Sequence, residues 1–228
     1  MPPSDWPMLS AAFFDLDGTL ADTAPDLAAA LNQVCREQGK KELSFDAIRP
    51  VVSNGGNALI KFAFNITEDS DEFSVLRDRF LEVYNARLHN STTLFPGMEA
   101  VLNYLEKNGY HWGVVTNKPS WLTDPLMARL GLEKRAICII SGDTTPYRKP
   151  HPGPLFLACE IAGCKPPDSV YIGDAERDIR AGIDAGMHTL VARYGYIEIN
   201  QDPSAWGADA MIDRPDEIIS WLKSHNNK

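Results

Sequence analysis

The chain carries several short apolar runs without polar alternation, a pattern typical of strands that are buried on both faces of a sheet. Helical patterns separate the later runs. Strands that alternate with helices predict an α/β fold with a parallel sheet covered on both sides. We predict strands at residues 11–15, 112–116, 137–140, 169–174 and 189–192, and an edge strand at 210–212.

Between residues 44 and 90 the pattern changes, because helical spacings continue without a convincing strand. Ser44 is placed to cap a helix over 45–52, and the Ser-Asn-Gly-Gly-Asn tract at 53–57 predicts a break. A long helix fits 71–88, where apolar residues repeat at helical spacing. We therefore expect a small helical domain inserted after the first strand and turn.

The insertion divides the chain into two predicted domains. An α/β core takes residues 1–22 and 94–228, and the α-helical domain takes residues 23–93. A chain of 228 residues is long enough for one ordinary domain and a smaller one.

Composition narrows the classes of partner and compartment. The net charge is −9 without a basic tract, so we expect neither nucleic acid nor an anionic membrane as a partner. No apolar run approaches a membrane span, and the first residues lack the features of an export signal. The four cysteines show no metal-ligand spacing. We expect reduced, mostly buried thiols in a cytoplasmic protein.

Candidate chemistry begins at the end of the first strand, with Asp15 and Asp17. An ionised aspartate can attack phosphorus, and a second carboxyl group two residues on can protonate the leaving oxygen. Gly18 allows the turn that brings both groups to one site. An exposed acidic turn and a calcium loop are the alternatives. The glycine is misplaced for the calcium loop, and a strand precedes the pair.

A second acidic group follows the strand at 169–174. Asp174 and Asp178 are four residues apart at a helix start, so they share a face. Together with Asp15 they would repel one another unless a cation lay between them, and oxygen ligands beside a phosphate favour Mg²⁺. Helix capping by Asp174 alone is the simpler alternative. Glu176 and Arg177 are interpreted as solvated helix residues.

Thr116 and Lys149 complete the predicted set. A hydroxyl group at a strand end can hold phosphate oxygens, and a lysine can neutralise charge on the phosphoryl group. Each residue taken alone would be interpreted as a surface feature. Lys118, Arg148 and His151 are interpreted as loop residues.

Together these residues resemble, in order, the four motifs of the haloacid dehalogenase-like phosphatases, over nearly the whole chain. The resemblance implies a Rossmann-like core with an α-helical cap. It also implies Mg²⁺ bound by Asp15, Asp174 and the backbone carbonyl of Asp17, with Asp178 in support. Asp15 would be the nucleophile and Asp17 the general acid and base. The matching segments are Asp15-Leu16-Asp17-Gly18-Thr19, Thr116-Asn117, Lys149-Pro150 and Gly173-Asp174 with Asp178.

A finer resemblance is to the phosphoglycolate phosphatases and the related N-acetylmuramic acid 6-phosphate phosphatases. Asp22-Thr23-Ala24-Pro25-Asp26 suits both groups, and Trp206-Gly207-Ala208-Asp209 is more similar to the second. The implied substrate is a small phosphorylated metabolite, and the protein would be a monomer or a homodimer. The residues expected to bind substrate are Thr116, Asn117, Lys149, Arg49, Asn54, Gly55 and Gly56. Arg49 could meet a substrate carboxylate or could be a solvated helix residue.

Three other functions stay open. A receiver-type signalling module also holds an aspartyl phosphate, but it is much shorter, and Asp17 is placed to hydrolyse the intermediate quickly. A dehalogenase of the same fold needs neither Asp17 nor a metal. A phosphomutase is harder to exclude, because it differs in cap contacts that the sequence does not show.

Overall fold

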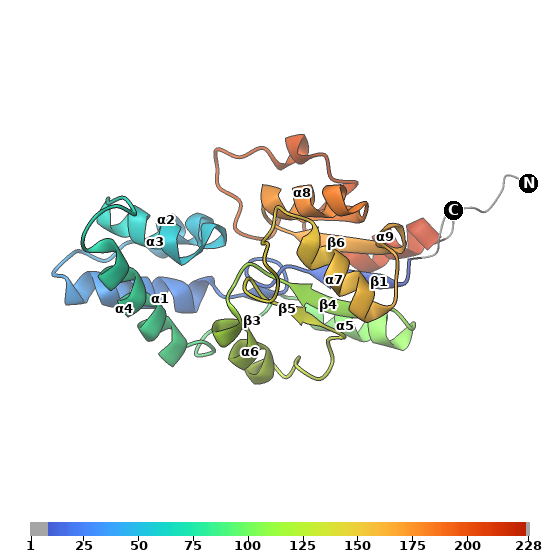
Figure 1. The fold of residues 1–228 in the computed structure, drawn as a ribbon, viewed down its shortest axis with the longest axis horizontal. Coiled ribbons are helices and arrows are strands. Elements are labelled where there is room, and N and C mark those ends of the chain that lie inside the picture. The colour runs from blue at the N-terminus through green and yellow to red at the C-terminus, as the bar shows by residue number, and fades with distance from the viewer. Residues whose placement is uncertain (1–8, 227–228) are drawn as a thin grey trace, which may run out of the picture.

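The computed structural model describes residues 9–226 of the chain, and a parallel six-stranded sheet forms the centre of its larger part (Figure 1). The strands lie in the order β5-β4-β1-β6-β7-β8. This arrangement confirms the predicted α/β fold. The strands are β1 (Ala11–Phe14), β4 (His111–Val115), β5 (Ile139–Ile140), β6 (Ser169–Gly173), β7 (His188–Ala192) and β8 (Ala210–Ile212).

The strand register decides which residues meet at the carboxyl edge of the sheet. Phe14, the last residue of β1, lies opposite Val114 of β4 and Ile172 of β6. The residues that follow these three strands therefore emerge side by side. In an open parallel sheet, this edge is where ligands bind.

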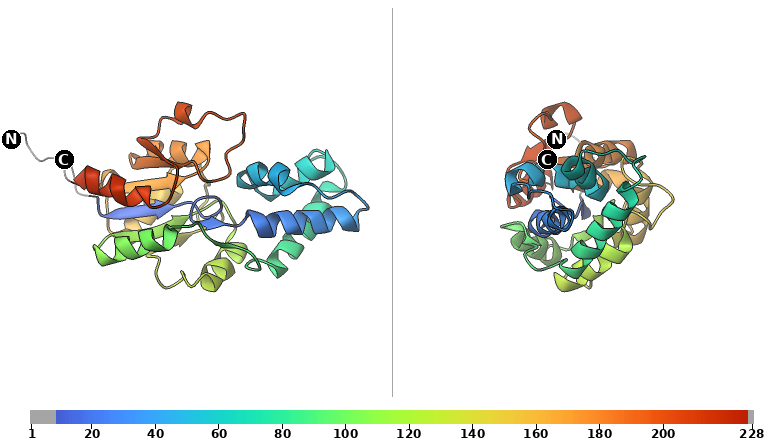
Figure 2. Two further views of the ribbon diagram at one scale, coloured as in Figure 1. Left: turned by 180° about the vertical axis from the view of Figure 1, so that it is seen from behind. Right: turned by 90° about the vertical axis from the view of Figure 1, so that its left-hand side faces the viewer.

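Helices cover both faces of the sheet, so successive residues of β1 enter two different cores (Figure 2). Phe13 packs in a core with residues of α7 and α8, and Phe14 packs in the core to which α5 and α9 contribute. Burial on both faces explains why β1 is apolar throughout. The helices are α5 (Met98–Lys107), α6 (Ser120–Arg129), α7 (Gly153–Ala162), α8 (Glu176–Ala185) and α9 (Glu217–Asn226), with short 3₁₀ turns at Pro166–Asp168 and Pro203–Trp206.

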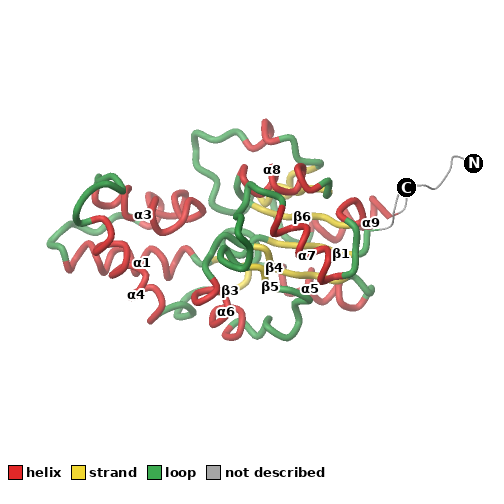
Figure 3. The backbone as a smooth tube through the Cα atoms, viewed as in Figure 1, coloured by secondary structure: helices red, strands yellow, loops and turns green. Residues whose placement is uncertain are grey.

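A helical insert lies beyond the carboxyl edge of the sheet, beside the core rather than on it (Figures 1 and 3). Its apolar residues pack mainly on one another, and α4 contacts both α1 and α3. The insert consists of α1 (Ala24–Glu37), α2 (Phe45–Ile48), the 3₁₀ helix η1 (Arg49–Asn54), α3 (Gly55–Phe64) and α4 (Phe73–Ala86).

Two local predictions for the insert differ in detail from the structure. The helix expected over 45–52 ends as an α-helix at Ile48 and continues as a 3₁₀ helix, because Pro50 has no N–H group to donate to the carbonyl four residues before it. The break expected over 53–57 is confirmed at Gly55, where φ 83° and ψ 178° separate η1 from α3, but it is shorter than expected, since α3 begins at that residue. Burial of Leu59 and Phe64 outweighs the low helix propensity of that tract.

Two short strands join the insert to the core. β2 (Ala21–Asp22) and β3 (Thr93–Leu94) pair antiparallel, so the outgoing and returning connections lie side by side. The buried Asp26 carboxylate strengthens this junction by accepting hydrogen bonds from the N–H groups of Ser91 and Thr92, at 2.9 and 2.8 Å. The sequence did not predict this pair, since two residues are too few to show a pattern.

The cysteines behave as the composition predicted. All four are free thiols, and Cys35, Cys138 and Cys159 are buried. None of the helices in residues 9–226 combines the length and the apolar character that a membrane crossing requires.

Candidate active site

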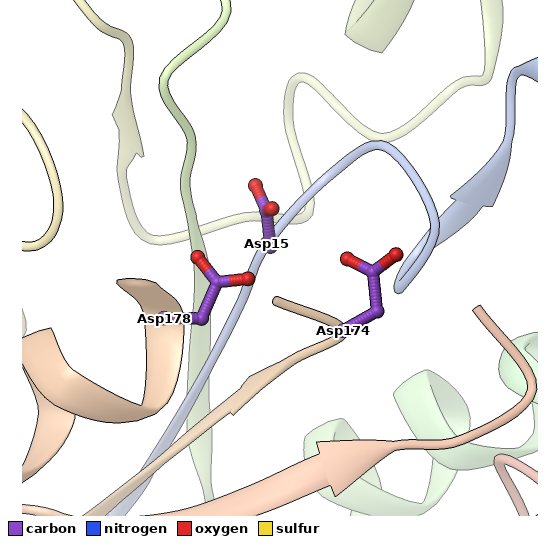
Figure 4. A group of neighbouring side chains, drawn as sticks. All are labelled: Asp15, Asp174 and Asp178. Carbon is purple, nitrogen blue, oxygen red and sulfur yellow. The ribbon is translucent and has the colours of Figure 1, made fainter. Parts of the chain in front are cut away.

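Three carboxylates meet at the carboxyl edge of the sheet (Figure 4). Asp15 follows β1, Asp174 follows β6, and Asp178 lies in the first turn of α8. One oxygen of each lies within 4.8 Å of the others, and all three residues are buried. The parallel register brings together groups that are more than 150 positions apart in the chain.

The cluster has the properties of a site for a hard divalent cation. Burial, together with the charges of Asp15 and Asp178, raises the pKa of Asp174 to about 7. Burial also raises the pKa of Asp178, although Lys149 opposes that effect. A cation would relieve this repulsion, and an all-oxygen donor set suits Mg²⁺ or Ca²⁺. The residues therefore fit a metal ion.

Lys149 is the cation within the cluster. Its Nζ lies 3.0 Å from Asp15 Oδ1 and 2.8 Å from Asp178 Oδ1, and its side chain is fully buried. Burial alone would raise the pKa of Asp15, but the charges of Lys149 and Arg177 outweigh it and hold that pKa below its usual value. Asp15 is therefore ionised at neutral pH.

Two neighbours hold Lys149 in position. Its Nζ donates to the hydroxyl group of Tyr171 at 2.7 Å, and that hydroxyl donates to the backbone oxygen of Val115 at 2.6 Å. The Asn117 side chain donates to the backbone oxygen of Lys149 at 2.9 Å and accepts from its N–H group at 3.0 Å. The loop that carries the lysine is thereby fastened to the end of β4.

Asp17 belongs to a second polar group beside the cluster. Lys118 Nζ lies 3.1 Å from Asp17 Oδ1 and donates to the Tyr84 hydroxyl at 2.9 Å, while Thr23 donates to the same Asp17 oxygen at 2.6 Å. The interpretation of Lys118 as a loop residue was incomplete, because its ammonium group is buried against Asp17 and Tyr84.

A cavity of about 590 Å³ lies between parts of the insert and the core. Thr116 and Asn117 line it from the core, and Asn54, Gly55 and Gly56 line it from the insert. Its other lining residues are Asp17, Leu27, Val52, Ser53, Asn57, Leu59, Arg77, Leu81, Tyr84, Lys118, Pro119, Leu122, Arg148 and Arg177.

Arg49 does not line this cavity. Its guanidinium group donates to the backbone oxygens of Gly195 and Tyr194, at 2.9 and 3.0 Å, and lies over the ring of Tyr196. Arg49 thus joins the insert to the core, and its hydrogen bonds leave it poorly placed to meet a substrate carboxylate.

The 3₁₀ helix η1 makes further contacts with the core next to the carboxylates. The Ser53 hydroxyl donates to Asp174 Oδ2 at 2.6 Å, and Arg177 donates to the backbone oxygen of Ser53 at 2.6 Å. Asn54 donates to Glu198. The interpretation of Arg177 as a solvated helix residue was wrong, because the three aspartates attract its guanidinium group toward the site.

Sequence reasoning missed Tyr171, Lys118, Ser53 and Arg177. Tyr171 lies within an apolar strand, where an aromatic residue is ordinary, and Ser53 lies in a tract that only indicated a break. A signal existed for Arg177, because it lies between Asp174 and Asp178 at a helix start. Its direction relative to the insert could not be known in advance.

Comparison with known proteins agrees with this geometry. The chain is 41% identical over 216 residues to N-acetylmuramic acid 6-phosphate phosphatase of Pseudomonas putida. The aligned region covers 95% of this chain and 97% of the relative. It is 41% identical over 208 residues to phosphoglycolate phosphatase of Xanthomonas campestris, over 91% and 94% of the two chains. The crystal structure of a predicted phosphoglycolate phosphatase from Haemophilus somnus matches with a TM-score of 0.83 at 28% identity, over 96% of this chain and 99% of that one.

The model of the haloacid dehalogenase-like hydrolase family matches residues 12–192, the stretch that holds every strand-end residue described above. With this match and with relatives that span nearly the whole chain, the protein belongs to the haloacid dehalogenase-like hydrolases.

Proposed function

We propose that this chain hydrolyses phosphate monoesters of small metabolites, with Asp15 as the nucleophile. The observation that carries the proposal is the buried contact of Asp15 with Lys149 beside Asp174 and Asp178. An ionised aspartate next to a lysine and a cation site is suited to attack phosphorus. The cavity that Asp17 and Thr116 line gives a substrate room to approach.

Two carboxyl groups, one as the nucleophile and one as the acid and base, account for every bond and proton of the reaction. An oxygen of Asp15 bonds to phosphorus as the ester oxygen leaves, and the carboxyl group of Asp17 gives that oxygen its proton. Asp17 then takes a proton from the water that attacks the aspartyl phosphate. The bond between phosphorus and Asp15 breaks, inorganic phosphate leaves, and both carboxyl groups return to their first state.

We infer that the metal is Mg²⁺, held by Asp15, Asp174 and the backbone carbonyl of Asp17, with Asp178 in support. The buried oxygen donors and the raised pKa of Asp174 support this assignment. When bound, the ion neutralises the carboxylates and polarises the phosphoryl oxygens. Lys149 keeps Asp15 ionised and adds positive charge beside the phosphoryl group.

Thr116 and Lys149 are the proposed phosphate-binding side chains. The Thr116 hydroxyl accepts a hydrogen bond from the Lys118 N–H group at 3.2 Å, which leaves its own proton for a phosphate oxygen. The Asn117 side chain is committed to the backbone of Lys149. We therefore assign its side chain to holding the lysine loop and its backbone N–H to substrate.

The cavity favours a sugar phosphate over a very small substrate. The relatives named above act on N-acetylmuramic acid 6-phosphate or on phosphoglycolate. A volume of about 590 Å³ lies within the range of roughly 300–1,000 Å³ that is usual for pockets of drug-sized ligands, and 2-phosphoglycolate would fill little of it. We propose N-acetylmuramic acid 6-phosphate, with Asn54, Gly55 and Gly56 bordering the sugar.

We also propose that residues 23–93 form a cap domain on a core of residues 1–22 and 94–228. The pairing of β2 with β3 supports these boundaries, since both connections cross there. Closure of such a cap would exclude bulk water while the aspartyl phosphate exists.

Phosphate release from N-acetylmuramic acid 6-phosphate with and without Mg²⁺ tests the proposal. Asp15→Asn should lower kcat by about 10³-fold or more, because an amide is a poor nucleophile. Asp69→Asn, the same change at an exposed position of the insert, should leave kcat unchanged. Unchanged turnover in Asp15→Asn would reject the mechanism.

Two other results would point to a different function. Interconversion of sugar-phosphate anomers without net phosphate release would identify a phosphomutase. A phosphoprotein that persists for hours after treatment with acetyl phosphate would indicate a signalling module instead.

A further inference from the structure

Helix α4 contributes a row of three residues to the cavity wall: Arg77, Leu81 and Tyr84. Their spacing of four and three residues places them on one face of the helix. Along the helix the three side chains are a cation, an apolar group and a phenol, so the polarity of the cavity wall changes from one end to the other.

The Tyr84 end of the row lies at the catalytic side of the cavity. Its hydroxyl group accepts a hydrogen bond from Lys118, which is paired with Asp17. Arg77 precedes Tyr84 by seven residues, which at ~1.5 Å per residue places its Cα about 10 Å further along the helix axis. Arg77 therefore lies at the end of the cavity remote from the catalytic aspartates.

The other cations of the cavity lining have partners within the protein. Lys118 is paired with Asp17, Arg148 donates to the backbone oxygen of Gly142 at 2.6 Å, and Arg177 donates to Ser53. Each of them helps to hold a segment of the site in place.

Arg77 has a weaker attachment. It donates to Asp78 Oδ1 from Nε at 3.0 Å and from Nη2 at 2.7 Å, and the Asp78 side chain is 66% exposed. Surface ion pairs of this kind contribute little. A carboxylate inside the cavity, less accessible to water, would compete with Asp78 for the guanidinium group, which can bind it through two parallel hydrogen bonds.

We propose that Arg77 determines substrate specificity by binding a carboxylate at the end of the substrate remote from the phosphate. This inference rests on the proposed phosphatase function. Leu27 and Leu81 line the cavity and offer apolar surface to the body of the substrate. A phosphorylated sugar that bears an acidic substituent spans such a cavity, whereas a carboxylate next to the phosphate ester is too short to reach Arg77.

The test compares two sugar phosphates that differ in the acidic group. N-acetylmuramic acid 6-phosphate carries a lactyl carboxylate, and N-acetylglucosamine 6-phosphate lacks it. Arg77→Gln should lower kcat/KM for the first by about 10- to 100-fold, mainly through KM, because a charge-assisted contact is lost. The same variant should leave kcat/KM for the second nearly unchanged, and Arg77→Lys should recover part of the loss.

Arg79→Gln is the matched control. Arg79 lies on the same helix but pairs with Glu37 and Glu82, and it does not line the cavity. It should leave the ratio of the two kcat/KM values as in the wild type. A melting temperature for each variant separates loss of folding from loss of recognition.

The possible failures are distinguishable. An equal loss on both substrates, no loss on either, or a wild-type preference for 2-phosphoglycolate would overturn the role of Arg77. Absence of phosphate release from all three substrates by wild-type protein with Mg²⁺ would instead overturn the proposed function.

Discussion

At the scale of single residues, the carboxylates depend on a backbone that leaves room for them. Gly18 has φ +81°, and a Cβ atom there would lie 2.1 Å from Asp174 Oδ2. Gly39, beyond the end of α1, has a similar φ of +67°, but a Cβ atom there would meet nothing within 4 Å. Both glycines serve a left-handed turn, and Gly18 is in addition pressed against the proposed metal site.

A comparison of alanine substitutions at Gly18 and Gly39 separates the energetic cost of a strained backbone from the cost of steric crowding. Gly39→Ala should lower the free energy of unfolding by about 1–2 kcal/mol, because its backbone must stay left-handed. Gly18→Ala should cost more and should also reduce Mg²⁺-dependent phosphate release, because Asp174 must move. Denaturant unfolding and phosphate assays measure the two effects. Wild-type activity in Gly18→Ala would show that Asp174 can shift without harm.

At the scale of elements, the 3₁₀ helix η1 docks on the core through contacts at both of its ends. Arg49 at its start bonds to the 194–195 backbone, and Ser53 near its end bonds to Asp174. Pro50 ends the preceding α-helix and so produces this 3₁₀ segment. The segment that the sequence predicted as part of an ordinary α-helix therefore connects the insert to the core.

Loss of the hydrogen bonds between Arg49 and the core should make the insert more mobile without unfolding the core. Arg49→Ala should raise KM several-fold and speed amide hydrogen exchange in residues 49–60, because two charge-assisted hydrogen bonds worth about 1.5–3 kcal/mol each are lost. Arg36→Ala, which removes an exposed ion pair with Glu42 in the same insert, is the control. Equal exchange rates in both variants would contradict this role.

At the scale of the whole molecule, the site is assembled from segments that follow β1, β4 and β6 and from the loop that carries Lys149. Most of its charge is acidic and buried, with Lys149 as the compensating ammonium group inside the cluster. A bound divalent cation should therefore stabilise the folded state as a whole, since the unfolded chain does not hold the three aspartates together.

Metal removal should lower the melting temperature. A Mg²⁺ concentration of about 100 times Kd should stabilise the protein by about 2.7 kcal/mol relative to EDTA. Asp174→Asn should lose most of this Mg²⁺-dependent increment, because it removes a proposed ligand. Calorimetry with and without EDTA measures the increment. A melting temperature that is independent of Mg²⁺ in the wild type would contradict the metal assignment.

Local patterns were sufficient for much of this structure. The runs ending near Asp15, Thr116 and Asp174 predicted parallel strands, and the rule that such strands end at one edge predicted that these residues meet. Burial on both faces makes a strand apolar throughout, so this information is contained in a few neighbouring residues. The sequence also predicted the helical insert, although the two glycines at its start obscured the helical pattern of α3.

Long-range packing decided the remaining features, because no local pattern records it. Arg49 and Arg177 are both arginines in helical segments, yet one joins the insert to the backbone at 194–195 and the other turns toward the aspartates. The β2–β3 pair is too short to show a pattern, and the Lys118–Asp17 contact joins residues 101 positions apart. Such contacts form only when distant segments of the chain pack together and remove these charges from water.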